Sequence, residues 1–114
     1  MGKYAGTIVT GIIGSGICGY KINVEAVSQD GRHVKIKIDS ECPNYLKVMD
    51  ELHEVDAYRE MFQKLHLGAV YQVLSKYIPH PSCPGLPGIL KTVEVAAGIA
   101  LPQTATMVIS KKQT

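Results

Sequence analysis

Apolar and polar residues alternate with a period of two along residues 20–28 and again along residues 33–42. Such alternation is typical of strands that bury one face and expose the other to water. In the first stretch the two faces are already distinct: Tyr20, Ile22, Val24 and Ala26 lie on one, and Lys21, Asn23 and Glu25 on the other. In the second, the apolar face carries Val34, Ile36 and Ile38. Two half-buried antiparallel strands are therefore expected.

The residues between these stretches, SQDGR, predict the turn that joins the two strands. They fit a three-residue hairpin loop, QDG, with Gly31 in the left-handed conformation that glycine adopts without strain. This loop pairs Ala26 with Val34. The same register, continued to the open end of the hairpin, places Cys18 opposite Cys42 on the apolar face.

Helical spacing of apolar residues dominates the second half of the chain. It predicts four helices, over residues 43–55, 57–65, 69–78 and 89–98. Pro43 occupies the first position of the first helix, and Asp56 caps the second. Two further strands are expected at 7–13 and 104–110, and a proline-rich irregular loop at 79–88. This order predicts a single α+β domain spanning residues 1–114. Its antiparallel sheet consists of the N-terminal hairpin or meander plus the C-terminal strand, with helices packed on one face.

Composition agrees with one globular domain and narrows its partners. The chain has 114 residues, of which 46% are hydrophobic, enough for a core without disulfides. A net charge of +2 and scattered lysines argue against nucleic acid. No apolar run reaches the length of a membrane span, and no targeting segment is evident, so we expect a cytoplasmic protein with no membrane partner.

The motif GSGICG, residues 14–19, matches the glycine pattern of dinucleotide-binding loops. Those loops need a helix directly after the glycines, because the helix N-terminus holds the pyrophosphate. Here a strand pattern follows, and the Gly-Lys-Ser/Thr of a P-loop is absent. The motif is better interpreted as a turn that carries Cys18.

The three cysteines of the chain, together with one histidine, form the candidate site. Cys83 follows His80 by three residues, in a loop just before the last predicted helix, where free amides and the helix dipole favour a thiolate. With Cys18 and Cys42 at the hairpin end, this makes a set of three cysteines and one histidine. Thiolate and imidazole ligands suit zinc or an iron–sulfur cluster.

The order of these residues resembles that of iron–sulfur cluster scaffold proteins of the NifU/IscU type. The segments that carry the resemblance are CGYKINVEA, VKIKIDSEC and HPSCPGLPGILKTVEVA. Tyr20 stands where those proteins have an aspartate, and their histidine adjoins the last cysteine. The resemblance implies a cluster scaffold or carrier that works with a sulfur-donor or cluster-accepting protein. The pattern C-G…C…H-x-x-C-P with EVAAGIALP also looks like a small uncharacterised three-cysteine family of anaerobic microbes.

We therefore expect a protein that binds a metal or an iron–sulfur cluster through Cys18, Cys42, Cys83 and His80, and that is a binding or carrier protein rather than an enzyme. The alternative is a thiol redox enzyme or sulfur acceptor with Cys83 as its nucleophile. A third interpretation is a small α+β protein whose cysteines only pack and which has an interaction role. A homodimer paired through the strand at 104–110 is also compatible with the sequence.

Overall fold

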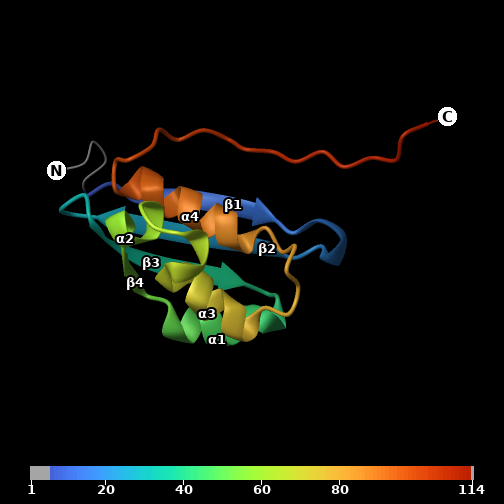
Figure 1. The fold of residues 1–114 in the computed structure, drawn as a ribbon, viewed down its shortest axis with the longest axis horizontal. Coiled ribbons are helices and arrows are strands. Elements are labelled where there is room, and N and C mark those ends of the chain that lie inside the picture. The colour runs from blue at the N-terminus through green and yellow to red at the C-terminus, as the bar shows by residue number, and fades with distance from the viewer. Residues whose placement is uncertain (1–5, 114) are drawn as a thin grey trace.

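The structure is a computed structural model that describes residues 6–113, and it is an α+β fold built on one antiparallel sheet. The strands follow one another across the sheet in chain order, β1 (Val9–Gly14), β2 (Lys21–Ser28), β3 (His33–Ser40) and β4 (Glu54–Asp56) (Figure 1). The helices are α1 (Leu46–Glu51), α2 (Ala57–Met61), α3 (Ala69–Tyr77) and α4 (Gly85–Ala96). Three short 3-10 turns complete the set, η1 (Gly16–Cys18), η2 (Pro43–Tyr45) and η3 (Leu65–Leu67).

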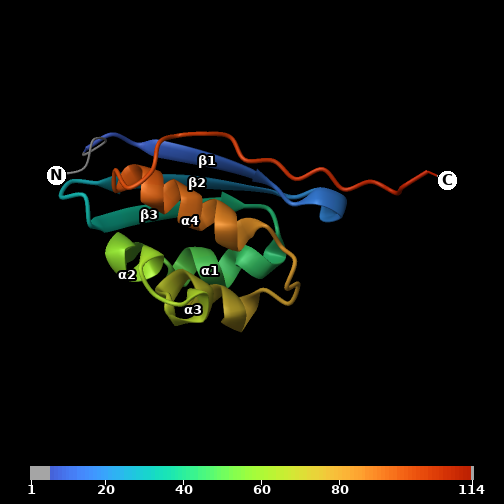
Figure 2. The ribbon, with the colours of Figure 1, turned by 45° about the horizontal axis from the view of Figure 1, so that its top comes forward.

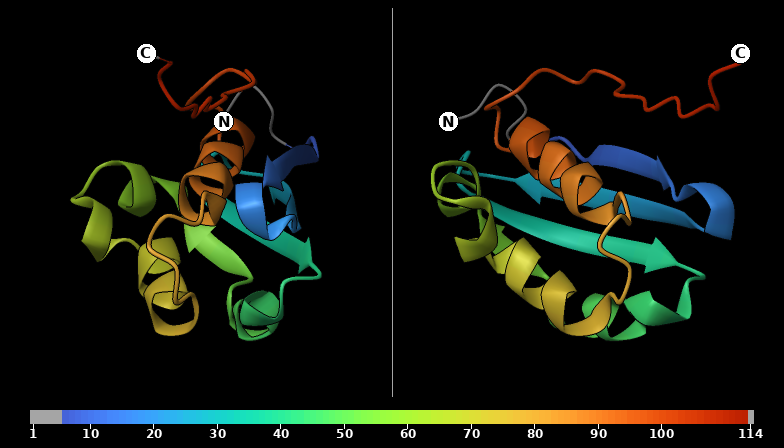
Figure 3. Two further views of the ribbon diagram at one scale, coloured as in Figure 1. Left: turned by 90° about the vertical axis from the view of Figure 1, so that its right-hand side faces the viewer. Right: turned by 45° about the vertical axis from the view of Figure 1, so that its right-hand side comes forward.

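The four α-helices cover the same face of the sheet, as expected from the alternation of the strands (Figure 2 and Figure 3). In β2 the even-numbered residues from Ile22 to Ser28 are buried, and in β3 those from Val34 to Ile38 are buried too. Helix α4 lies across β1 and β2 and contributes the fully buried Ile89 and Val93. The core therefore forms between one face of the sheet and the helices.

The β2–β3 register differs from the predicted one by two residues. Ala26 pairs with Ile36, and Ser28 pairs with Val34. Gly31 has a φ of 78°, the left-handed conformation that was predicted, but the turn around it is longer. Side chains close this turn: Gly31 N donates to Ser28 Oγ (2.9 Å), and Asp30 Oδ1 accepts from the amides of the two residues after Gly31. A shift of two keeps every side chain on its predicted face, so apolar patterning could not detect it.

The fourth strand is not the one that the sequence predicted. The helix expected over 43–55 ends at Glu51, and β4 pairs with the first residues of β3, with Val55 opposite Val34. Asp56 then caps α2 as predicted, because its carboxylate accepts from Tyr58 N and Arg59 N. Residues 104–110, predicted as the last strand, lie in a segment over 101–113 that forms no helix or strand.

Helix α4 begins at Gly85, four residues earlier than predicted, and includes part of the segment that was expected to be irregular. Pro87 is tolerated there because the first turn of a helix needs no donor from its amides. The two glycines of this turn allow close packing: a Cβ on Gly88 would lie 2.3 Å from the side chain of Ile13, and one on Gly85 would meet Tyr45. The predicted irregular segment is therefore confirmed over residues 79–84, and residues 85–88 belong to the helix instead.

Candidate functional site

The three cysteines lie in three connections at one end of the sheet, where β1 and β3 end and β2 begins. Cys18 ends η1, between β1 and β2. Cys42 is the residue before η2, after β3, and Cys83 lies two residues before α4. Antiparallel pairing brings the connections that carry Cys18 and Cys42 to the same end of the sheet. The connection between α3 and α4 brings Cys83 to that end, against Tyr45.

A buried tyrosine lies at the centre of this region. Tyr45 is 1% exposed, and its hydroxyl oxygen lies 3.2 Å from Cys83 Sγ. The turn η2 positions it, because Tyr45 N donates to Cys42 O (3.0 Å). The start of α4 leaves room for the hydroxyl only because residue 85 is glycine: a Cβ there would lie 1.9 Å from the hydroxyl oxygen. Tyr45, Cys83 and Gly85 therefore pack as one unit.

The pKa of the buried Tyr45 phenol is raised above its ordinary value. Burial is the main cause that raises the pKa of its phenol, followed by the hydrogen bond with Cys83. Negative charge on Cys83, on Cys42 and on Cys18 would raise this pKa further. The phenol consequently keeps its proton at neutral pH, and it can donate that proton in a hydrogen bond to a Cys83 thiolate. Sequence reasoning missed Tyr45; the only signal was its position three residues after Cys42, in CPNY.

Cys18 and Cys42 do not form the cross-strand pair that the predicted register placed on the apolar face. Strand β2 begins only at Lys21, so the ladder does not reach Cys18. Instead Cys18 is exposed in η1, where Gly16 and Gly19 have φ values of 81° and 76°. A Cβ on either glycine would meet nothing within 4 Å, which means that this turn is surrounded by open space.

His80 and Cys83 share one tight turn, as predicted, since Cys83 N donates to His80 O (3.2 Å). The His80 side chain is exposed, whereas Cys42 and Cys83 are half-buried against the core. Over residues 6–113, no group of three or more His, Cys, Asp or Glu side chains is already arranged around a single metal position. The three cysteines thus lie in one region of the fold, but their side chains are not arranged as the ligands of a metal ion.

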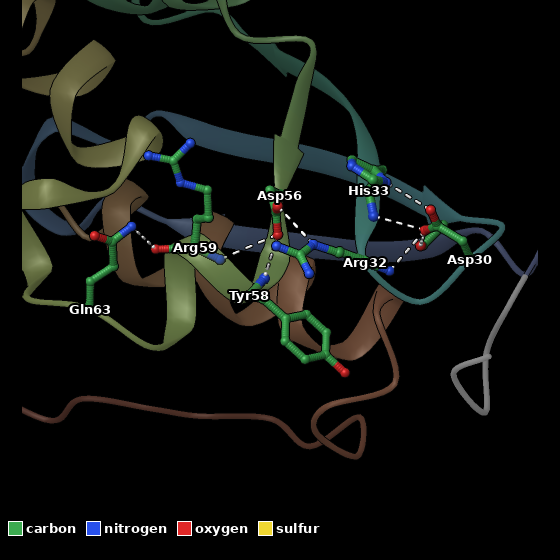
Figure 4. A network of polar contacts seen from close by, with 8 residues as sticks. Asp30, Arg32, His33, Asp56, Tyr58, Arg59 and Gln63 are labelled. Carbon is green, nitrogen blue, oxygen red and sulfur yellow. Dashed lines mark hydrogen bonds and ion pairs between the residues drawn. The ribbon is translucent and has the colours of Figure 1, made fainter.

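A second polar cluster lies at the other end of the sheet, around the β2–β3 turn (Figure 4). His33 Nδ1 lies 2.7 Å from Asp30 Oδ2, and Arg32 Nε donates to Asp56 Oδ2 at 2.8 Å. All four side chains hold the turn and the start of α2 in place, and the His33–Asp30 pair is more than half exposed. This cluster is therefore structural.

Comparison with known proteins finds one family. A model described as "Family of unknown function (DUF6951)" matches residues 9–109. No curated protein and no solved structure matches the chain. The match thus includes all three cysteines and His80, and it offers no evidence for the NifU/IscU resemblance. No helix within the described residues is long and apolar enough to cross a membrane.

Proposed function

The chain belongs to the DUF6951 family, whose function is unknown, and we propose from its own residues that it binds a soft metal centre, zinc or an iron–sulfur cluster, through Cys18, Cys42 and Cys83. His80 is the proposed fourth ligand. The observation that carries this proposal is the gathering of all three cysteines of the chain at one end of the sheet, where the hydroxyl of Tyr45 contacts Cys83.

The donor set fits such a centre. Thiolates are the ligands that zinc and iron–sulfur clusters prefer, and four donors complete a tetrahedral site. Cys42 and Cys83 are half-buried, so they would hold the metal from the protein side. Cys18 is exposed on a turn with two left-handed glycines and open space around it, so η1 has room to move when Cys18 binds the metal.

The bound centre would supply either a structural crosslink, in the case of zinc, or an iron–sulfur unit that can be carried. The order of C-G, a hairpin, a second cysteine and a third cysteine with a nearby histidine before a helix resembles that of NifU/IscU scaffold proteins and favours the cluster. As a scaffold or carrier, the protein would have a sulfur-donor or cluster-accepting protein as its partner. Tyr45 would donate a hydrogen bond to the Cys83 sulfur, which is how outer residues orient and tune metal ligands.

The test uses the full chain expressed both aerobically and anaerobically. We expect elemental analysis to find about one zinc per chain, the content of a single four-ligand site, or the protein to absorb visible light because it holds an iron–sulfur cluster. Single replacements Cys18→Ser, Cys42→Ser and Cys83→Ser should each reduce the metal content. His80→Ala is matched by His66→Ala, an exposed histidine on η3 that should leave the content unchanged. A metal-free protein from both preparations would refute the proposal.

A second candidate function rests on Cys83 alone. Its position two residues before α4 and its contact with the Tyr45 hydroxyl make Cys83 the candidate nucleophile. As a sulfur acceptor, its thiolate would attack the terminal sulfur of a persulfide on a donor protein. A new S–S bond forms on Cys83 while the donor's S–S bond breaks, and the donor leaves as a thiolate.

Iodoacetamide labelling separates the two candidates. One fast-reacting cysteine at neutral pH, Cys83, in protein without added chelator would support the acceptor. Three cysteines that stay protected until a chelator is added would support the metal centre. Mass spectrometry of the labelled peptides identifies which cysteine reacted.

A further inference from the structure

The two edges of the sheet differ in how well they are protected. An unpaired edge strand attracts other strands, and proteins block this with short edges and charges. The β4 edge is three residues long and carries Glu54 and Asp56. The β1 edge is six residues long, VTGIIG, with no charge and no proline. Within residues 6–113, strand β1 pairs only with β2, so among these residues its outer edge offers about three N–H and three C=O groups without a strand partner.

The same chain contains a segment with the properties of a missing strand. Residues 104–110, TATMVIS, are rich in β-branched residues and extended, but no backbone group of residues 101–113 hydrogen-bonds to another residue within 6–113. The exposed fractions of Met107, Val108 and Ile109 are 70%, 90% and 89%. Three neighbouring large apolar side chains this exposed are unfavourable in water and indicate that the segment acquires a partner.

In its own chain this segment does not reach the β1 edge. After α4, Ile99 N and Ala100 N both donate to Glu94 O, and the chain then runs above α4 in the same direction as β1 (Figure 1 and Figure 3). A groove of about 690 Å³ lies between β1 and this segment. It is lined by β1, by α4 residues such as Thr92, and by residues 102–107. The segment continues past the end of β1, so that its last described residues lie beyond the globular part of the molecule (Figure 1).

We propose that residues 104–110 of one copy pair as a fifth strand with the free edge of β1 in a second copy, and that the exchange is mutual. Within the described residues, every chain carries both an unpaired, uncharged edge and an unpaired segment of similar length that can become a strand, so two copies satisfy each other in a closed two-fold dimer. In a strand, Ala105, Met107 and Ile109 share one face. On the helix side of β1, these side chains would fill the groove beside α4. This inference is independent of the proposed metal centre.

The experiment measures the mass of the full chain in solution by light scattering at about 0.1 mM, a concentration well above the micromolar range of ordinary complexes. We expect a dimer. A chain that ends at Gln103 should be a monomer, and so should the full-length double variant Met107→Pro/Val108→Pro, since one of two successive amides must face β1 and proline cannot donate to a ladder. The conservative replacement Thr106→Val, which keeps strand propensity, should leave the dimer intact.

Complementation identifies the two surfaces. The double variant Thr10→Lys/Ile12→Lys places charges on the β1 edge and keeps the segment, whereas the chain ending at Gln103 keeps the edge and lacks the segment. Each alone should be a monomer, and their mixture should form a heterodimer with one exchanged strand.

Three results would overturn the inference. One is a full-length chain that stays monomeric with rapid hydrogen exchange at residues 104–110. Another is a monomer whose amides at 104–110 are protected, which would mean closure on its own β1. The third is a dimer that persists without the segment.

Discussion

The hydroxyl of Tyr45 and the sulfur of Cys83 form a hydrogen-bonded contact of 3.2 Å between η2 and the start of α4. The contact joins residues 38 positions apart and links two of the three cysteine-bearing connections, because Tyr45 N is also bonded to Cys42 O. A buried tyrosine needs a partner for its hydroxyl, and here that partner is a thiol. The stability of this end of the fold and the chemistry of Cys83 are therefore coupled.

The close approach of Gly85 to Tyr45 predicts that an alanine at position 85 lowers the free energy of unfolding instead of raising it. Replacing a helical glycine by alanine usually stabilises a protein by about 0.4–1 kcal/mol. Gly85→Ala should instead destabilise by about 2–3 kcal/mol, because the new Cβ would lie 1.9 Å from the Tyr45 hydroxyl oxygen. Tyr45→Phe removes that oxygen, so the double variant should recover much of the loss. Urea unfolding of the two single variants and the double variant measures the coupling.

Gly14→Ala is the matched control for this cycle. A Cβ on Gly14 would meet nothing within 4 Å, and its φ is not positive. Its free energy of unfolding should therefore change by less than about 0.5 kcal/mol. Strict additivity of Gly85→Ala and Tyr45→Phe would show that the two residues do not compete for the same space.

Metal binding should raise the free energy of unfolding of the protein. A ligand that binds only the folded state at a hundred times its Kd adds about 2.7 kcal/mol to the free energy of unfolding. We expect added zinc to raise the Tm of the reduced wild-type chain and a chelator to reverse the rise. Cys83→Ser should abolish the response, whereas Ser82→Ala, an exposed neighbour in the same turn, should keep it. Equal responses of these two variants would exclude Cys83 as a ligand.

Glu60 is a buried residue that caps the start of α3. It is 8% exposed, and its two carboxylate oxygens accept from Ala69 N (2.8 Å) and Val70 N (2.9 Å), the first amides of α3. Glu60→Gln leaves one of these amides facing an NH₂ group, and it should cost about 1–3 kcal/mol of stability. Glu41→Gln, at an exposed position, is the control and should be neutral. Thermal unfolding of the two variants makes the comparison.

Much of the fold was predictable because its signals are periodic. The strands β2 and β3, the helix α3, the capping role of Asp56 and the conformation of Gly31 all follow from local patterns. Strand β4 was not predictable in this way, because its three residues fit a helical spacing as well as a strand. Only the unpaired edge of β3 decides between the two, and an edge is a tertiary property.

The candidate site was predictable in part, for a similar reason. Antiparallel connectivity brings Cys18 and Cys42 to one end of the sheet, as the hairpin pattern predicted, whereas Cys83 reaches that end through the connection between α3 and α4. The detailed pairing of Cys18 with Cys42 was wrong, because it extended a strand register through glycines that turn the chain. Tyr45 was missed, because a buried hydroxyl that contacts a thiol depends on the missing side chain of Gly85, forty residues later in the sequence.

The His33–Asp30 pair predicts a pH dependence of stability (Figure 4). The hydrogen bond from His33 is the main cause that lowers the pKa of Asp30, and the bond to Asp30 is the main cause that raises the pKa of His33. A raised histidine pKa stabilises the folded state fully below the ordinary value of 6.5 and is lost as the pH rises through the folded value. A lowered carboxyl pKa stabilises above the ordinary value of 3.8 and is lost as the pH falls.

Both contributions are therefore present together between about pH 4 and pH 6.5, the ordinary pKa values of the two groups. His33→Gln should lower the Tm in this window, and the difference from wild type should shrink towards zero by about pH 9, where histidine is neutral in both states. His66→Gln, at an exposed position on η3, should show no such window. If His33→Gln lowers the Tm by the same amount at every pH, the His33 side chain contributes through packing and its charge does not contribute.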